Sequence, residues 1–275
     1  MAIRFDDRVA IVTGAGAGLG RSHAMLLASR GAKVVVNDPG GAVDGSGGQH
    51  AVADKVVAEI KGAGGQAVAN YNSVADMNSA QGIVDTAMNT WGRCDILVNN
   101  AGILRDKAFN NMSMEDFEFT VQVHFMGTVY CTKAAWPIMR KQQYGRVVVT
   151  TSGSGTVGNF GQSNYGAAKM AVNGLINVLR FEGAKYNILC NAISPSARTR
   201  MTEEVFSQTM AAPAEGEFDA MAPENVAPLV VWLGSVDSAE VTGRVFEVEG
   251  GKIRDRKSTR LNSSHVVTSR IPSSA

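Results

Sequence analysis

Hydrophobic residues occur along this chain in short runs that alternate with longer amphipathic segments. Runs rich in valine, isoleucine and alanine have the length of single strands and lie at residues 8–13, 32–38, 66–71, 94–100, 145–152, 188–194 and 243–251. The segments between them show helical spacing, at 19–30, 50–61, 76–91, 115–141 and 163–186. Continuous apolar strands separated by helices are typical of a parallel sheet that is buried on both faces. The pattern therefore predicts an α/β fold.

The alternation continues without a change of composition as far as residue 253, so residues 1–253 are predicted to form one domain. The last 22 residues, 254–275, contain six serines, five lysines or arginines and one aspartate, and they lack apolar periodicity. We expect these residues to form a disordered tail. The tail resembles the translated end of a cloning or sequencing adapter, and a native disordered tail is the alternative.

Composition narrows the class of protein. The chain has 275 residues, is 45% apolar and 19% charged, and has a formal net charge of +1. These values suggest neither a disordered protein nor nucleic-acid binding. No apolar run reaches membrane-spanning length and the first residues lack the apolar region of a signal peptide, so we expect no membrane partner. Cys94, Cys131 and Cys190 are widely spaced in apolar surroundings, which predicts buried free thiols, no metal site and a reducing, cytoplasm-like compartment.

The first strand leads directly into "TGAGAGLG", residues 13–20, and then into a helix. Gly14, Gly18 and Gly20, with Gly16 in addition, allow the backbone to turn tightly and to approach a pyrophosphate at the positive end of the helix. A purely structural turn is the alternative. The position between a first strand and an amphipathic helix favours nucleotide binding.

Two further motifs lie at strand ends. Asp38 ends the second strand, eighteen residues after Gly20, where a carboxylate accepts hydrogen bonds from ribose hydroxyls and repels a 2′-phosphate. This position favours NAD over NADP, and a turn aspartate is the alternative. "NNAG", residues 99–102, ends the fourth strand, where Asn99 either satisfies backbone groups or contacts the cofactor.

The segment "SNYGAAK", residues 163–169, places Tyr165 and Lys169 four residues apart on one face of a predicted helix. A neighbouring ammonium group stabilises a phenolate, so we expect Lys169 to lower the pKa of Tyr165 and make it a proton donor and acceptor. Ser152 ends the fifth strand and can donate a hydrogen bond to a substrate oxygen. Ser154 is the neighbouring candidate.

Taken together and in this order, these motifs resemble the short-chain dehydrogenase/reductase family over residues 5–252. The resemblance implies a single doubly wound Rossmann-type domain with helices on both faces of a parallel sheet, assembled as a homodimer or homotetramer. It implies Tyr165 as acid and base, Lys169 on the nicotinamide ribose and Ser152 on the reacting oxygen. It also implies cofactor contacts from a larger set, namely Thr13, Gly14, Gly16, Gly18, Leu19, Gly20, Asp38, Asn72, Ser73, Asn99, Ala101, Gly102, Tyr165, Lys169 and Pro195.

Within the family, "NAGILRDKAF", "VHFMGT" and the loop "NDPGGAVDGSGG" (37–48) resemble the dehydrogenase unit of the D-bifunctional proteins of fatty-acid β-oxidation. This resemblance implies NAD-dependent oxidation of a (3R)-3-hydroxyacyl-CoA. His124 stands where most family members have an asparagine, and it either relays protons or packs. Asn72 stands where an aspartate usually contacts the adenine.

The alternatives to this activity are reduction of a 3-oxoacyl carrier protein, oxidation of a steroid alcohol, and a non-catalytic NAD sensor. The resemblance implies a cytoplasmic location, or a peroxisomal one if the sequence is part of a longer eukaryotic protein.

Overall fold

The computed structural model describes residues 3–48, 50–199, 213 and 216–256. Within these residues one sheet has the strand order β3-β2-β1-β4-β5-β6-β7-β8. The strands are β1 (Val9–Thr13), β2 (Lys33–Asn37), β3 (Gln66–Asn70), β4 (Ile96–Asn99), β5 (Gly145–Thr150), β6 (Ile188–Ser196), β7 (Val245–Glu249) and β8 (Lys252–Arg256). Neighbouring strands from β3 to β7 are parallel, and β8 pairs antiparallel with β7.

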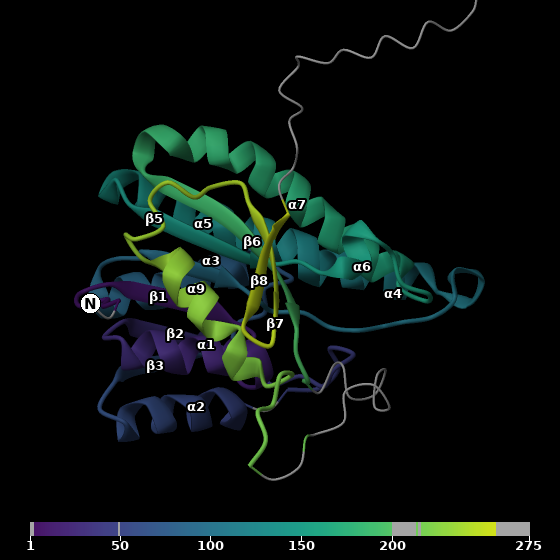
Figure 1. Ribbon diagram of the computed structural model, residues 1–275, viewed down its shortest axis with the longest axis horizontal. Coiled ribbons are helices and arrows are strands. Elements are labelled where there is room, and N and C mark those ends of the chain that lie inside the picture. Colours follow the sequence, from purple (N-terminus) through teal and green to yellow (C-terminus); the bar gives the residue numbers. More distant parts are fainter. Residues whose placement is uncertain (1–2, 49, 200–212, 214–215, 257–275) are drawn as a thin grey trace, which may run out of the picture.

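The order of the strands reverses between β1 and β4. From β1 the chain moves outward through β2 to β3, and it then returns to place β4 on the other side of β1. In doubly wound sheets, ligands bind at the carboxyl ends of the strands beside such a reversal. These ends face the right-hand side of Figure 1, where α4 and α6 also lie.

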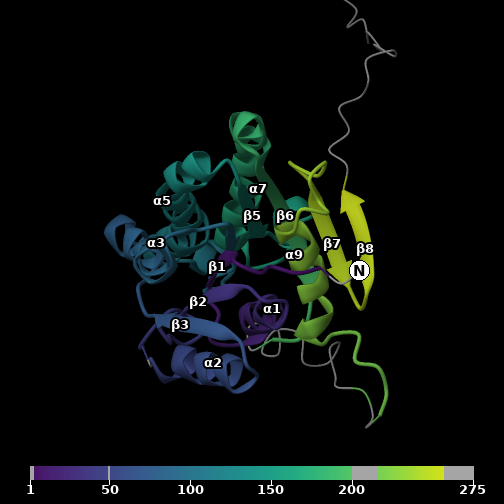
Figure 2. The same cartoon turned by 90° about the vertical axis from the view of Figure 1, so that its left-hand side faces the viewer.

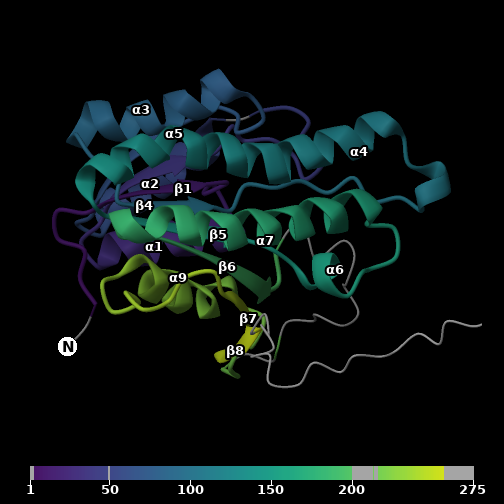
Figure 3. The ribbon, with the colours of Figure 1, turned by 90° about the horizontal axis from the view of Figure 1, so that it is seen from above.

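Helices cover both faces of the sheet. They are α1 (Gly18–Ser29), α2 (Ala51–Gly62), α3 (Met77–Trp91), α4 (Met114–Val121), α5 (Gly127–Gln142), α6 (Gly153–Thr156), α7 (Ser163–Gly183) and α9 (Ala227–Gly234). Figure 2 shows α1, α2 and α9 on one face and α3, α5 and α7 on the other. Seen from above in Figure 3, α5 and α7 run side by side, with α4 and α6 at the same end of the molecule.

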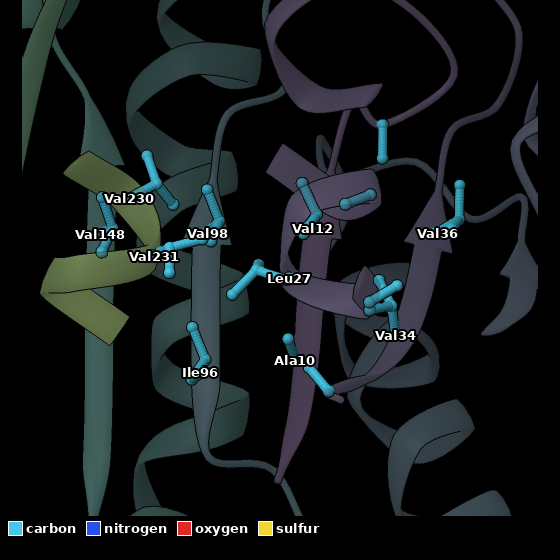
Figure 4. Close-up of a cluster of buried hydrophobic side chains, with 14 of the residues drawn as sticks. Ala10, Val12, Leu27, Val34, Val36, Ile96, Val98, Val148, Val230 and Val231 are labelled. Atoms are coloured by element: carbon cyan, nitrogen blue, oxygen red, sulfur yellow. The ribbon is translucent and has the colours of Figure 1, made fainter. Parts of the chain in front are cut away.

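Each face of the sheet buries its own hydrophobic cluster, because strands covered on both sides are apolar at successive positions. In β1, for example, every residue is buried, with Ala10 and Val12 in one cluster and Val9 and Ile11 in the other. Figure 4 shows the first cluster, in which Leu27 of α1 lies among side chains from β1 and β4.

The predicted fold class is confirmed, and the structure differs from the predicted elements at three points. The predicted helix 115–141 is interrupted by a π-helical turn, Gln122–Met126, between α4 and α5. Helix α9 was not predicted, because its sequence is apolar on nearly all sides and lacks an amphipathic period. Residues 254–256, assigned to the tail, form part of β8. The remaining tail residues, 257–275, lie outside the described part of the chain.

Among the described residues, none of the helices combines the length and the apolar character needed to cross a bilayer.

Candidate active site

The glycine-rich turn connects β1 to α1 at the centre of the sheet. Gly14 has a φ of +64°, and a Cβ atom there would lie 2.8 Å from Ala101 Cα. A Cβ on Gly20 would lie 2.1 Å from the Gly14 carbonyl oxygen. No side chain caps the N-terminus of α1, so the N–H groups of its first turn remain available to an anion. This turn fits the pyrophosphate of a dinucleotide.

Asp38 lies beside this turn, directly after β2. Its Oδ2 accepts the Gly16 N–H at 2.8 Å, and its Oδ1 accepts the Gly40 N–H at 2.7 Å. A carboxylate oxygen accepts more than one hydrogen bond, so both oxygens can still receive ribose hydroxyls. The two backbone donors fix the orientation of the carboxylate.

The two asparagines of "NNAG" have different positions. Asn99 is buried, and its Nδ2 donates to Thr132 Oγ1 at 3.1 Å, which is a structural contact. Asn100 lines the cavity described below, and its Nδ2 donates to the Thr13 and Gly14 carbonyls, each at 3.1 Å. Asn100 thus holds the glycine-rich turn in place. The sequence analysis did not select this residue, although it belongs to the same motif.

Ser152, Tyr165 and Lys169 come together at the carboxyl end of β5. Tyr165 and Lys169 lie one turn apart on α7, with Lys169 Nζ 5.4 Å from the centre of the Tyr165 ring. Lys169 Nζ donates to the Thr150 carbonyl at 2.6 Å, which ties α7 to β5. Ser152 follows β5 and accepts the Ser154 N–H at 3.2 Å. The phenol, the hydroxyl and the amine all line one cavity.

Burial sets the proton affinities of this group. Desolvation raises the pKa of Tyr165 to about 12, with the Ser152 hydrogen bond opposing this rise and the Asp106 charge adding to it. Desolvation also lowers the pKa of Lys169 to about 7. The prediction that Lys169 lowers the Tyr165 pKa is wrong for this structure, because burial of the phenol outweighs the effect of an amine that is itself desolvated. Burial therefore favours the protonated phenol of Tyr165 at neutral pH.

His124 lies in the π-helical turn, beside Tyr165. Its ring stands edge-on to the Tyr165 ring, with centroids 5.0 Å apart, and its Nε2 lies 3.0 Å from the Ile103 nitrogen and 2.7 Å from the Ile103 oxygen. Burial and the nearby Lys169 charge hold the pKa of His124 well below its usual value. A neutral ring engaged with backbone groups supports the packing alternative over the proton relay.

The carboxyl edge of the sheet encloses a cavity of about 970 Å³. Besides Ser152, Tyr165, Lys169 and His124, the predicted residues that line it are Gly14, Gly18, Leu19, Gly20, Asp38, Ser73, Ala101, Gly102 and Pro195. The remaining predicted residues, which do not line the cavity, are Thr13, Gly16, Asn72 and Asn99. Thr13 Oγ1 accepts the Asn100 and Ala101 N–H groups, and Asn72 Nδ2 donates to the Ser79 carbonyl at 3.0 Å. The contact of Asn72 with adenine stays a prediction.

A polar network that the sequence analysis did not identify lies next to Tyr165. Gln162 Nε2 donates to Asp106 Oδ2 at 2.6 Å, and Ser154 Oγ donates to Gln162 Oε1 at 2.7 Å. Burial raises the pKa of Asp106. The only sequence feature that points to this network is the position of Gln162, about one helical turn before Tyr165.

Among the described residues, no group of side chains is arranged to hold a metal ion.

A buried tyrosine and lysine that share a cavity with a glycine-rich turn, at the carboxyl edge of a doubly wound sheet, are the arrangement of a nicotinamide-dependent dehydrogenase that acts on alcohols. The short chain dehydrogenase family matches residues 8–210, and the chain belongs to this family.

Several known proteins are similar to the chain. A peroxisomal multifunctional enzyme type 2 of Mus musculus is 51% identical over 251 residues, which cover 91% of this chain and 33% of that protein. A putative short-chain type dehydrogenase/reductase of Mycobacterium tuberculosis is 51% identical over 249 residues, covering 90% of this chain and 84% of that protein. A hydroxyacyl-CoA dehydrogenase of the same organism is 40% identical, covering 90% and 79%. The chain thus spans about a third of the mouse enzyme.

A solved structure shares the fold. This structure, a 7α-hydroxysteroid dehydrogenase complexed with NADH and 7-oxo glycochenodeoxycholic acid, superimposes with a TM-score of 0.80 at 29% identity. The match covers 90% of this chain and 95% of that one.

Proposed function

We propose that the chain oxidises a (3R)-3-hydroxyacyl-CoA to the 3-oxoacyl-CoA with NAD, and catalyses the reverse reduction. The observation that supports this proposal most directly is that Ser152, Tyr165 and Lys169 share one cavity with Asp38 and the glycine-rich turn. An alcohol carbon held beside Tyr165 is thereby brought to the cofactor.

The chemistry follows from the positions of the side chains. When bound, the oxidised nicotinamide ring supplies the hydride acceptor. In the reduction, the Tyr165 phenol, which burial keeps protonated, gives its proton to the C3 carbonyl oxygen while C3 receives the hydride. In the oxidation, the deprotonated fraction of Tyr165 takes the proton of the C3 hydroxyl while the hydride leaves C3 and the C–O bond becomes a carbonyl. Ser152 donates a hydrogen bond to the reacting oxygen. Lys169, whose Nζ donates to the Thr150 carbonyl, would bind the nicotinamide ribose, and His124 holds the Ile103 backbone through its Nε2.

The choice of NAD rests on Asp38. Its carboxylate is held at the cavity wall by two backbone donors, and a 2′-phosphate would have to approach this negative charge. The residues that follow it are Pro39, Gly40 and Gly41, which supply no cation. Electrostatic repulsion by Asp38 and the lack of a cation in the three residues that follow it both favour the 2′-hydroxyl of NAD.

The choice of substrate rests on similarity. The multifunctional enzyme and the hydroxyacyl-CoA dehydrogenase described above support an acyl-CoA thioester. The putative dehydrogenase of M. tuberculosis is as similar as the mouse enzyme and its name gives no substrate. The hydroxysteroid dehydrogenase structure makes a steroid alcohol the second candidate.

A direct test is production of NADH from pure (3R)- and (3S)-3-hydroxyacyl-CoAs, with steroid alcohols as a third arm. Ser152 and Tyr165 fix the reacting oxygen from one side, and the nicotinamide fixes the direction of hydride transfer, so one enantiomer fits. We expect kcat/KM for the 3R form to be at least ~100-fold higher, about 2.7 kcal/mol of discrimination. Equal rates for the enantiomers, or a preference for steroids, would reject the substrate.

We also propose that the chain acts as a homodimer or homotetramer in a reducing compartment. Helix α7 exposes Met170, Val178 and Phe181 by 52%, 54% and 64%, and apolar exposure of this kind supports an interface. The three cysteines are free and buried. Light scattering of the purified protein measures the assembly, and a monomer would contradict this proposal.

A further inference from the structure

The loop that follows Asp38 forms part of the cofactor cavity. We name residues 39–48 the clasp. Pro39, Gly41, Ala42, Val43, Gly45 and Gly47 of the clasp line the cavity. The clasp is folded on itself, because Ala42 N–H donates to the Ser46 carbonyl at 2.8 Å and Gly45 N–H donates to the Ala42 carbonyl at 3.0 Å. It therefore extends the cavity wall beyond the end of β2.

The tip of the clasp is attached to the loop that follows β4. The Leu104 N–H donates to the Val43 carbonyl at 2.9 Å, and Arg105 Nε donates to the Asp44 carbonyl at 2.9 Å. Arg105 also pairs with Asp116 of α4 at 3.2 Å and lies 4.4 Å above the centre of the Phe119 ring. Arg105 thus joins the clasp to α4.

Gly45 makes the closest approach at this attachment. Its φ is +86°, and a Cβ atom there would lie 2.9 Å from Phe119 Cε1 and 3.1 Å from Ile103 Cγ2. Ile103 in turn contacts His124, which stands beside Tyr165. One continuous wall therefore runs from Asp38, where the adenosine ribose is proposed to bind, to the catalytic tyrosine.

The attachment is weak compared with the rest of the fold. None of the residues 39–48 is buried, and five of these ten are glycines, namely Gly40, Gly41, Gly45, Gly47 and Gly48. A segment without buried side chains contributes nothing to the core and opens at a small cost compared with global unfolding. The clasp can open while the sheet and helices stay folded.

We propose that the clasp, held closed by Arg105, controls how fast the nicotinamide cofactor leaves its cavity. Arg105 is a positioning residue in this proposal, since its contacts are with the clasp and α4. The proposal rests on the binding of a dinucleotide in the cavity and is independent of the substrate. A bound dinucleotide contacts the clasp wall, so detaching that wall removes contacts and shortens the residence time.

Two glycine variants test this proposal as a matched pair. Gly45→Ala and Gly47→Ala both place a Cβ at positive φ, +86° and +69°, so both strain the backbone. At Gly45 the Cβ pushes the clasp away from Phe119, whereas at Gly47 it meets nothing within 4 Å. The measurement is the dissociation rate of NADH, followed by stopped-flow fluorescence after mixing with excess NAD. We expect a rise of at least ~10-fold for Gly45→Ala and less than ~2-fold for Gly47→Ala.

Arg105→Lys provides a second variant if Gly45→Ala does not fold. Lysine retains the charge facing Asp116 but lacks the planar group that donates to Asp44 and stacks on Phe119, so we expect the NADH dissociation rate to rise ~5-fold. Equal NADH dissociation rates in the wild type and in all three variants, or the same rise in both glycine variants, would overturn the proposal.

The stopped-flow dissociation assay is repeated with NADPH in place of NADH, to separate a failure of the clasp proposal from a failure of the proposed cofactor choice. Binding of NADPH in place of NADH would reject the proposed cofactor choice, and the glycine pair then tests the clasp with NADPH. Failure of the wild type to bind either dinucleotide would overturn both proposals.

Discussion

We expect His23 to make the stability of this protein dependent on pH. The side chain lies on α1, is fully buried, and neither ring nitrogen has a hydrogen-bond partner among the described residues. Desolvation lowers the pKa of His23 to about 3. In the unfolded chain the imidazole takes up a proton near its ordinary pKa of about 6.5. The unfolded state therefore binds one more proton than the folded state between these two values, and the native state loses stability as the pH falls from about 6.5 towards 3.

The magnitude follows from the two pKa values. Each pKa unit corresponds to about 1.36 kcal/mol, so the full difference is worth about 5 kcal/mol below pH 3. Between pH 7 and pH 4.5 the contribution of His23 alone is about 2.5 kcal/mol. His23→Leu removes both the titrating group and two unpartnered buried nitrogens. We expect this variant to be at least as stable as the wild type at pH 7 and to lose about 2.5 kcal/mol less on acidification.

Urea unfolding of both proteins at pH 7 and pH 4.5, at one protein concentration, measures this difference. Leu27→Ala is the matched control, because it changes another buried residue one turn along α1 without removing a titrating group. The control should be destabilised by about 2–5 kcal/mol to the same extent at both pH values. If the wild type and His23→Leu lose the same free energy on acidification, His23 does not stay neutral in the folded state.

Four further predictions concern the site and the C-terminal end. Tyr165→Phe should lower kcat/KM by about 10²–10⁴-fold while NADH still binds, and near-wild-type turnover would reject Tyr165 as the acid and base. Lys169→Ala should weaken both NADH affinity and turnover, so a loss of only one would show that Lys169 serves a single role. Asp38→Ala combined with Pro39→Arg should raise NADP use relative to NAD at least ~10-fold, as measured by the ratio of kcat/KM values, and an unchanged ratio would contradict the role of Asp38. Deletion of residues 257–275 should leave the melting temperature unchanged. Deletion of residues 252–275 removes β8 and exposes the edge of β7, so it should lower the melting temperature. Equal melting temperatures for the two deletions would contradict the assignment of β8 to the domain.

Local patterns in the sequence were sufficient for the fold class and for selecting most of the predicted residues that line the cavity. The strand Val9–Thr13 is recognisable because it is apolar at every position, and the turn after it because glycines allow a close approach of the backbone. Tyr165 and Lys169 are recognisable because four residues correspond to about one helical turn. Each of these signals is contained in a few consecutive residues.

Sequence reasoning failed where the outcome depends on what covers a residue. Helix α9 is buried nearly all round, so no polar face shows its period. Strand β8 is charged at four of its five positions, and its pairing partner is the edge of β7. The π-helical turn places His124 against the loop after β4, where its Nε2 accepts the Ile103 N–H, a contact between residues 21 positions apart.

The tertiary structure decided how the separate motifs act together. The strand order places β2, β1, β4 and β5 side by side, and this arrangement brings Asp38, the glycine-rich turn and Ser152 to one cavity although more than a hundred residues separate the first from the last. It also decided the proton affinities. The pKa of Tyr165 rises and that of Lys169 falls because segments distant in sequence exclude water from both side chains. Desolvation depends on these folded surroundings, so the local sequence around Tyr165 and Lys169 does not reveal it.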